Sequence, residues 1–244
     1  MLTKTQEKYT NSLKQKKYRE ESGSFVVEGE KAVEEFLYSA FEIEMIIALP
    51  EWLSKHRGIE KRFENKVIEA TPINMERISS FSTPSIVLAV VKIPLQPGNY
   101  KPDTFILMLD GIRDPGNLGT IIRNADWFGI QHIICSPDCA DAYNPKTVQA
   151  SMGSLARITV YENDLVQVLE KNSMPVYGAV MKGPSLYEIQ NPVPGIILIG
   201  NEGNGIRPAL LPFISNPIFV VGKGKAESLN ASVACGIICS WLCK

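Results

Sequence analysis

The sequence predicts an α/β protein with two domains. Short apolar runs alternate with segments of helical spacing along almost the whole chain, which is the pattern of strands and helices packed in layers. A break in this alternation, "PLQPGNYKPD", holds three prolines and a glycine in ten residues and is typical of a linker. We therefore expect a domain over residues 1–93, a linker over 94–103 and a second domain over 104–244.

Composition agrees with a globular chain and excludes several classes of protein. The 244 residues are 45% hydrophobic and 21% charged, enough for a sizeable core. The net charge of −1 gives no global indication of a nucleic-acid partner. Five cysteines and no secretory signal at the start favour the reducing cytoplasm. The apolar segment near the C-terminus is too polar and too short for a bilayer, which takes about 20 apolar residues.

The first domain begins with a basic segment and continues as a mixed strand and helix pattern. Residues 1–19 hold six basic residues and one acidic residue, which suits either a phosphate-binding arm or a solvated helix. The periodicity that follows predicts strands at Phe25–Val27, Ile43–Leu49, Val67–Ile68 and Ile86–Ile93, helices at Gly29–Ala40 and Glu51–Arg62, and a helix that starts at Thr71–Pro72.

The sequence of the second domain predicts a mostly parallel sheet with helices on both faces. We expect strands at Phe105–Leu109, His132–Cys135, Val176–Val180, Gly195–Ile199 and Pro217–Val221, and helices at Asn117–Phe128, Asn144–Leu155, Asn163–Lys171 and Ser228–Leu242. In such sheets ligands bind beyond the carboxyl ends of the strands.

Three stretches of this domain carry polar residues where a strand ends or a helix begins. They are "LDGIRDPGNLGTIIRNADWFG", "LIGNEGNGI" and "KAESLNASVACGI". Each has a plain structural interpretation: Asn117 caps a helix and Arg123 is a surface charge, Glu202 lies on a glycine-rich turn, and Ser228 and Asn230 open an apolar helix. The glycines of "GNEGNGI" do not follow the G-x-G-x-x-G order of a dinucleotide-binding turn, which argues against a nucleotide-dependent oxidoreductase.

Together, and in this order, the three stretches resemble the motifs of the SpoU family of RNA ribose 2′-O-methyltransferases, part of the SPOUT superfamily. The segment "NPKTVQASMGSL" between the first two also resembles the family. The N-terminal half, above all "KKYREESGSFVVEGEKAVEEFL", is similar to the substrate-binding domain of these enzymes. The resemblance covers nearly the whole chain.

The resemblance implies a SPOUT α/β knot: a trefoil-knotted, mostly parallel sheet in the C-terminal domain, beside a smaller RNA-binding α/β domain. It also implies that the knot binds S-adenosylmethionine, with Gly200, Val220 and Leu229 in contact with the cofactor, largely through backbone groups. The family usually has Ile-Pro-Met around Val220, whereas this chain has Val220-Val221-Gly222.

The resemblance assigns the catalytic roles to five polar residues. Arg123 is the residue that activates the ribose hydroxyl, and we expect it to act by electrostatic stabilisation because an arginine is not readily deprotonated. The others are expected to orient Arg123 and the ribose, with Glu202 as an ion-pair partner of Arg123. The full set is Asn117, Arg123, Glu202, Ser228 and Asn230.

The resemblance further implies an RNA substrate, ribosomal RNA in preference to transfer RNA, and a homodimer formed through the catalytic domains. A tRNA methyltransferase and a non-catalytic RNA-binding protein of the same fold stay open as alternatives. No metal is expected, because the two histidines fall in different predicted domains and the cysteines lack the spacing of a zinc site.

Overall fold

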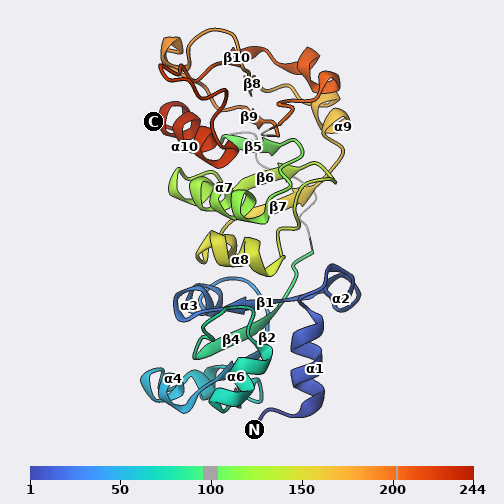
Figure 1. Cartoon of the computed structure of the whole chain (residues 1–244), viewed down its shortest axis with the longest axis vertical. Helices are drawn as coiled ribbons and strands as arrows, with labels where there is room; N and C mark the ends of the chain where they lie inside the picture. The colour runs from blue at the N-terminus through green and yellow to red at the C-terminus, as the bar shows by residue number, and fades with distance from the viewer. Residues whose placement is uncertain (96–103, 202) are drawn as a thin grey trace. The chain divides into compact units, whose positions relative to one another are not determined.

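The computed structural model describes residues 1–95, 104–201 and 203–244. It divides into two compact units, which are described separately (Figure 1). The first unit contains residues 1–95 and 143–156, and the second contains residues 96–142 and 157–244. The predicted linker lies almost wholly outside the described residues, and the predicted domain boundaries stay a prediction.

The first unit is built around a four-stranded sheet in the order β1-β4-β2-β3. Strand β4 runs antiparallel to both β1 and β2, whereas β3 is parallel to β2. Its elements are α1 (Lys4–Ser12), α2 (Lys16–Ser22), β1 (Ser24–Glu28), α3 (Glu30–Leu37), β2 (Ile43–Ala48), α4 (Pro50–Lys55), α5 (Ile59–Arg62), β3 (Val67–Glu69), α6 (Pro72–Ile78), β4 (Val87–Lys92), α8 (Pro145–Ser151) and η1 (Ser154–Ala156).

Two predicted helices of this unit are interrupted at residues with positive φ. The segment predicted as one helix from Glu51 to Arg62 forms α4 and α5, separated around Gly58, whose φ is +97°. The helix predicted over Asn144–Leu155 ends at Ser151, because Met152 and Gly153 have φ of +52° and +91°. A left-handed residue cannot continue an α-helix, so both predictions were too long.

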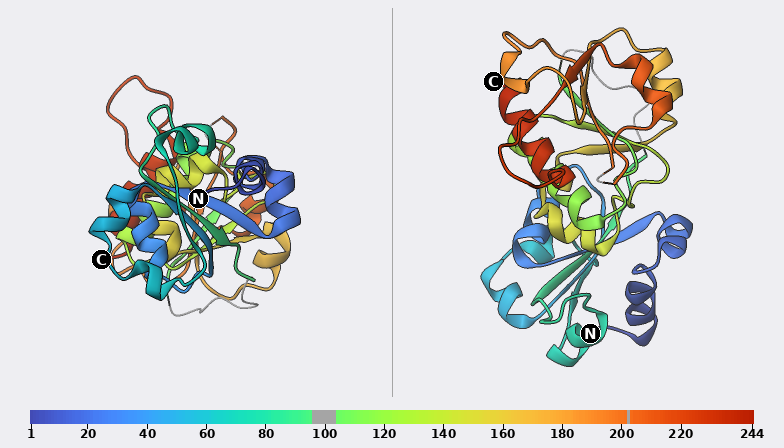
Figure 2. Two further views of the ribbon diagram at one scale, coloured as in Figure 1. Left: turned by 90° about the horizontal axis from the view of Figure 1, so that it is seen from below. Right: turned by 45° about the horizontal axis from the view of Figure 1, so that its top comes forward.

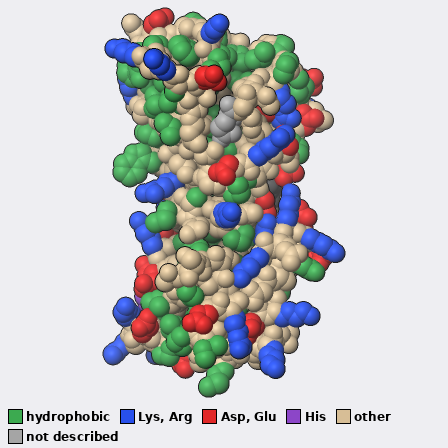
Figure 3. Space-filling view, viewed as in Figure 1, with side chains coloured by type: hydrophobic (Ala, Val, Ile, Leu, Met, Phe, Trp, Pro, Cys, Tyr) green, Lys and Arg blue, Asp and Glu red, His purple; other side chains and the backbone are tan. Residues whose placement is uncertain are grey.

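The basic N-terminal segment is folded as α1 and α2 and packs on its own unit. Thr3 caps α1 through a capping box, and the hydroxyl of Tyr9 donates to Glu44 on β2. Arg19 is only 2% exposed and donates to the carbonyl of Leu13, so this residue is structural and the arm interpretation is wrong for it. Several lysines of α1 and α2 are exposed, and Figure 3 shows basic side chains gathered over these helices.

The second unit holds a six-stranded sheet in the order β10-β8-β9-β5-β6-β7, and every neighbouring pair is parallel. Its elements are β5 (Ile106–Leu109), α7 (Pro115–Trp127), β6 (His132–Cys135), β7 (Thr159–Glu162), α9 (Leu165–Glu170), β8 (Val176–Ala179), η2 (Leu186–Glu188), β9 (Ile196–Ile199), η3 (Pro208–Phe213), β10 (Asn216–Ile218) and α10 (Ala231–Leu242).

Helices cover both faces of this sheet, which explains the continuous apolar runs of its central strands. All four residues of β5 are fully buried, and so are the first three of β9. Ile106 and Met108 pack in one core with Leu165 and Leu169 of α9. Helices α7 and α10 pack against each other on the opposite side (Figures 1 and 2). The predicted parallel α/β sheet is confirmed.

The sequence analysis missed one strand and misplaced the end of another. Strand β7 pairs with β6 at the edge of the sheet, although no strand was predicted over Thr159–Glu162. The strand predicted over Pro217–Val221 is β10, which ends at Ile218.

Within the described residues, no helix has the length and apolarity that crossing a membrane requires.

Candidate active site

The start of α7 places Asn117 at the carboxyl edge of the sheet. Asp114 is the N-cap, and its carboxylate accepts from the backbone amide of Asn117 at 2.8 Å. The plain interpretation of Asn117 as the helix cap is therefore wrong. Because Asp114 supplies the cap, the side chain of Asn117 is available for a longer-range contact.

That contact joins the first and third motifs, which lie 113 residues apart in the chain. The amide Nδ2 of Asn230 donates to Oδ1 of Asn117 at 2.9 Å. Oδ1 of Asn230 caps α10 by accepting from the backbone amides of Ser232 and Val233. One asparagine thus starts α10 and ties it to α7. The helix predicted to start at Ser228 starts at Ala231, and Ser228 lies exposed in the segment before it.

A second contact holds the two helices together beside Arg123. Nδ2 of Asn124 donates to the carbonyl of Ser232 at 2.8 Å, and a side chain on Gly236 would crowd Asn124. Arg123 itself is exposed and has no hydrogen bond or ion pair with another described residue. It lies six residues after Asn117, roughly 9 Å further along the helix. Glu202, its predicted partner, lies outside the described residues.

The turn after β9 explains the glycines of the second motif. A Cβ on Gly200 would lie 2.2 Å from the carbonyl carbon of Gly205, because the chain folds directly back on itself. Asn201 and Gly205 exchange two backbone hydrogen bonds across this turn, at 2.8 and 3.1 Å. Gly200 is therefore required by the close approach of the backbone.

The segment after β10 is open, in contrast to the compact turn after β9. Residues 221–230 form no helix or strand, and all ten are exposed. The peptide groups of residues 221–229 make no hydrogen bond to another described residue. Val221 and Leu229 are large apolar residues with 48% and 44% of their surface exposed, while Val220 is half-buried.

These features fit a nucleoside cofactor. Unused peptide donors and acceptors suit the edge of an adenine ring, and exposed aliphatic side chains suit its faces. Of the three residues predicted to contact the cofactor, Val220 directly precedes this open segment, Leu229 lies within it, and Gly200 directly follows β9. No group of three metal-binding side chains occurs among the described residues.

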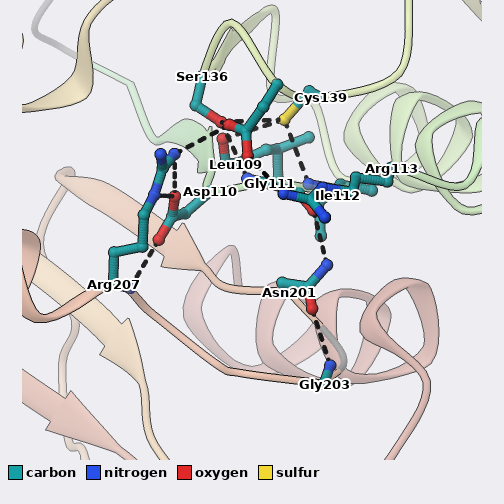
Figure 4. A network of polar contacts seen from close by, with 11 residues as sticks. Leu109, Asp110, Gly111, Ile112, Arg113, Ser136, Cys139, Asn201, Gly203 and Arg207 are labelled. Carbon is teal, nitrogen blue, oxygen red and sulfur yellow. Dashed lines mark hydrogen bonds and ion pairs between the residues drawn. The ribbon is translucent and has the colours of Figure 1, made fainter.

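A polar network next to the turn after β9 was not predicted from the sequence. It joins the loops after β5 and β6 to the turn after β9 (Figure 4). Asp110 is 1% exposed and is ion-paired with Arg207, whose guanidinium also contacts Asp138 at 3.1 Å. The hydrogen bond to the Asp110 carboxylate raises the pKa of Arg207. A hydrogen bond from Ser136 lowers the pKa of Asp138.

The same network contains a thiol with an altered pKa. Cys139 accepts from the backbone amide of Ile112 at 3.3 Å. Its contact with Cys135, together with other hydrogen bonds, lowers the pKa of Cys139 to about 7 despite burial. The same contact, with burial, raises the pKa of Cys135 well above its usual range. One proton of this pair is therefore released far more readily than the other.

A surface pocket of about 470 Å³ is lined in part by Arg207 and Asp138 of this network. It opens at the carboxyl ends of β6 and β7, and none of the residues predicted for the site lines it. The lining includes Asp138, Asp164 and Arg207.

The sequence does contain one signal for the polar network. Asp110 directly follows an apolar strand, and a carboxylate buried at such a position needs a partner.

Two family models match this chain, one in each half. Residues 104–240 match the model of the SpoU rRNA Methylase family, and residues 4–89 match the MRM3-like substrate binding domain. The 23S rRNA (guanosine(2553)-2′-O)-methyltransferase RlmP of Bacillus subtilis is 32% identical over 93% of this chain and 91% of its own length.

Solved structures agree over the full length. An RNA methyltransferase structure of the TrmH family from Porphyromonas gingivalis has a TM-score of 0.87 and 37% identity, with 99% of this chain and 98% of that chain covered. An AdoMet-bound rRNA methyltransferase from Sinorhizobium meliloti has a TM-score of 0.88 and 27% identity, with 99% and 95% covered. With three motifs gathered at one edge of a parallel sheet, this chain belongs to the SpoU rRNA methylase family.

Proposed function

We propose that this protein transfers a methyl group from S-adenosylmethionine to a ribose 2′-hydroxyl of ribosomal RNA. The observation that carries the proposal is the hydrogen bond between Asn117 and Asn230. It joins the motifs at the start of α7 and the start of α10, directly beside the open segment 221–230. Family membership and an rRNA 2′-O-methyltransferase as a relative support the same reaction.

The cofactor belongs between the turn at Gly200 and the open segment. Gly200, Val220 and Leu229 would hold it, through peptide groups and aliphatic contacts. When bound, S-adenosylmethionine supplies an electrophilic methyl group on a sulfonium. The segment Val220-Val221-Gly222 lacks the proline usual in the family, so its backbone has more freedom before the cofactor binds.

Arg123 is proposed to stabilise the oxygen of the ribose as its proton leaves. A guanidinium stays protonated in proteins, so it acts as a fixed positive charge and hydrogen-bond donor rather than as a base. Asn117, Ser228 and Asn230 are proposed to orient the ribose and Arg123. Glu202 is proposed to pair with Arg123 and restrict its rotamers.

The first unit is proposed to bind the RNA. Its match to a substrate-binding domain supports this role, as do the exposed lysines over α1 and α2. Contacts of this kind to phosphates weaken steeply as salt increases. Ribosomal RNA is preferred over transfer RNA because rRNA enzymes occur among the full-length relatives.

A homodimer through the second units is part of the proposal. Cys235 and Cys239 of α10 are fully buried and cannot form such an interface. Val233 on α10 and Trp127 at the end of α7 are better candidates for the interface, with 50% and 82% of their surface exposed. Sedimentation of a monomer at micromolar concentration would contradict the dimer.

We place the protein in the cytoplasm, where its five free thiols would stay reduced. The trefoil knot, likewise, stays a prediction from the family resemblance.

Ribose-methylation mapping of total RNA from cells with and without the gene tests the function. Loss of a single 2′-O-methyl group in ribosomal RNA is the expected result. Loss in transfer RNA instead would favour the tRNA alternative. An unchanged map, together with no heat in a calorimetric titration with S-adenosylmethionine, would favour a non-catalytic RNA-binding protein.

A further inference from the structure

A buried carboxylate stands at the end of the central strand β5. Asp110 accepts from the backbone amide of Arg207 at 2.7 Å and is ion-paired with its guanidinium. Figure 4 shows the two side chains directed toward each other from different loops. Removing one partner of a buried ion pair is strongly destabilising, because the remaining charge is left without compensation.

Arg207 lies at the end of the turn that begins with Gly200. Its guanidinium also reaches Asp138 at 3.1 Å. Asp138 accepts from the hydroxyl of Ser136 at 2.7 Å, and that hydroxyl accepts from the amide of Gly111 at 2.9 Å. The end of the turn is thus fixed to the loops after both β5 and β6.

The start of the turn is fixed to the same place. Nδ2 of Asn201 donates to the carbonyl of Gly111 at 2.8 Å, and Oδ1 of Asn201 accepts from the amide of Gly203 at 2.9 Å. The two ends of a glycine-rich turn are therefore held on two consecutive residues, Asp110 and Gly111. Glycine-rich segments lose the most conformational freedom on ordering, so these contacts determine whether the turn is ordered before a ligand arrives.

We propose that Asp110 and Arg207 are positioning residues for cofactor binding. Their ion pair holds the turn of Gly200 in its binding conformation, and neither side chain touches the cofactor. This inference rests on the proposed function, in which Gly200 contacts S-adenosylmethionine. The binding free energy of the cofactor then need not order the turn, which raises its affinity.

Calorimetric titration with S-adenosylhomocysteine tests the proposal on Arg207→Gln, Asp110→Asn and the double variant. Arg207→Gln should weaken binding by about tenfold or more, because it leaves a buried carboxylate without its cation. In the double variant two neutral amides face each other, so it should recover much of the lost affinity. The matched control is Arg113→Gln, which removes an exposed contact to Asp138 outside the turn and should leave the affinity within about twofold.

Steady-state kinetics separates positioning from general damage to the fold. Arg207→Gln should raise KM for S-adenosylmethionine, while kcat at saturating cofactor and KM for RNA stay close to the wild-type values. If Arg207→Gln does not fold, Asp110→Asn alone serves the test, since its side-chain oxygen still accepts from the amide of Arg207.

Two results would overturn the inference. The first is unchanged cofactor affinity in both single variants, and the second is a double variant whose loss is the sum of the two single losses. Absence of cofactor binding by the wild-type protein would instead refute the proposed function.

Discussion

The loops after β5 and β6 and the segment after β10 leave the same edge of one parallel sheet, yet they are built in opposite ways. The first two are closed by a network around the buried Asp110 and its partner Arg207. The segment over residues 221–230 is exposed throughout and has no regular structure. Side-chain contacts thus fix one half of the edge, while in the other half the peptide groups of residues 221–229 make no hydrogen bond to another described residue.

The largest effect is expected for Arg123→Ala on helix α7. Losing an electrostatic stabiliser typically lowers turnover by about 10²-fold or more, whereas binding of the cofactor should stay nearly intact. Single-turnover methylation of RNA at saturating cofactor measures the loss. Arg113→Ala, which removes another exposed arginine of the same motif, is the control and should retain activity. A normal rate for Arg123→Ala would show that the chemistry lies elsewhere.

Gly200→Ala addresses the boundary between the two halves. The new Cβ would meet the backbone of Gly205 at 2.2 Å, so the turn must open. We expect cofactor affinity to fall by roughly tenfold or more and the free energy of unfolding to fall by about 1–3 kcal/mol, the range for overpacking. Gly224→Ala is the matched control for stability, because nothing lies within 4 Å of its Cβ position. Equal stability of the two variants would refute the close-packed turn.

Asn230 has two separable functions, and two variants distinguish them. Asn230→Ala removes the cap of α10 and should cost about 1 kcal/mol of stability. Asn230→Asp keeps a capping oxygen but replaces the amide that donates to Asn117. We expect Asn230→Asp to unfold close to the wild type and yet to methylate RNA several-fold more slowly. If both activities are normal, Asn230 is only a helix cap.

The network in the closed half should lower the pKa at which the Cys139 thiol titrates. Its pKa in the folded protein is about 7, below the ordinary value of 9.0. Its thiolate therefore stabilises the fold above pH 9, and this contribution is lost as the pH falls from 9 through 7. Iodoacetamide alkylation of Cys139 should accelerate with a midpoint near pH 7, and Cys139→Ser should remove this phase. A midpoint near 9 would argue against the network.

Most of the fold was predictable because burial imposes a simple pattern. The fully buried strands β5 and β9 are continuous apolar runs, and their neighbours in a parallel sheet read in the same way. Strand β7 was missed because it is not a continuous apolar run: its first and last residues, Thr159 and Glu162, are polar and are not buried. The breaks at Gly58 and Met152 depend on backbone angles that periodicity does not report.

The candidate site was predictable only where residues recur as motifs. Asn117, Asn230 and the glycines of the turn after β9 were singled out together, and Asn117 and Asn230 lie in contact. The competition between Asp114 and Asn117 for the cap could not be decided, because both residue types cap helices well. The pairing of Asp110 with Arg207, 97 residues later in the chain, depends on tertiary structure alone.

Hydrogen–deuterium exchange with and without S-adenosylmethionine tests the central claim most directly. The peptide groups of residues 221–229 have no hydrogen-bond partner among the described residues, so they should exchange fast in the free protein. On cofactor binding, exchange should slow in this segment and in the turn after Gly200, and stay unchanged around Ser136 and Asp164. Protection confined to Ser136 and Asp164 at the surface pocket, with residues 221–229 still exchanging fast, would contradict the account.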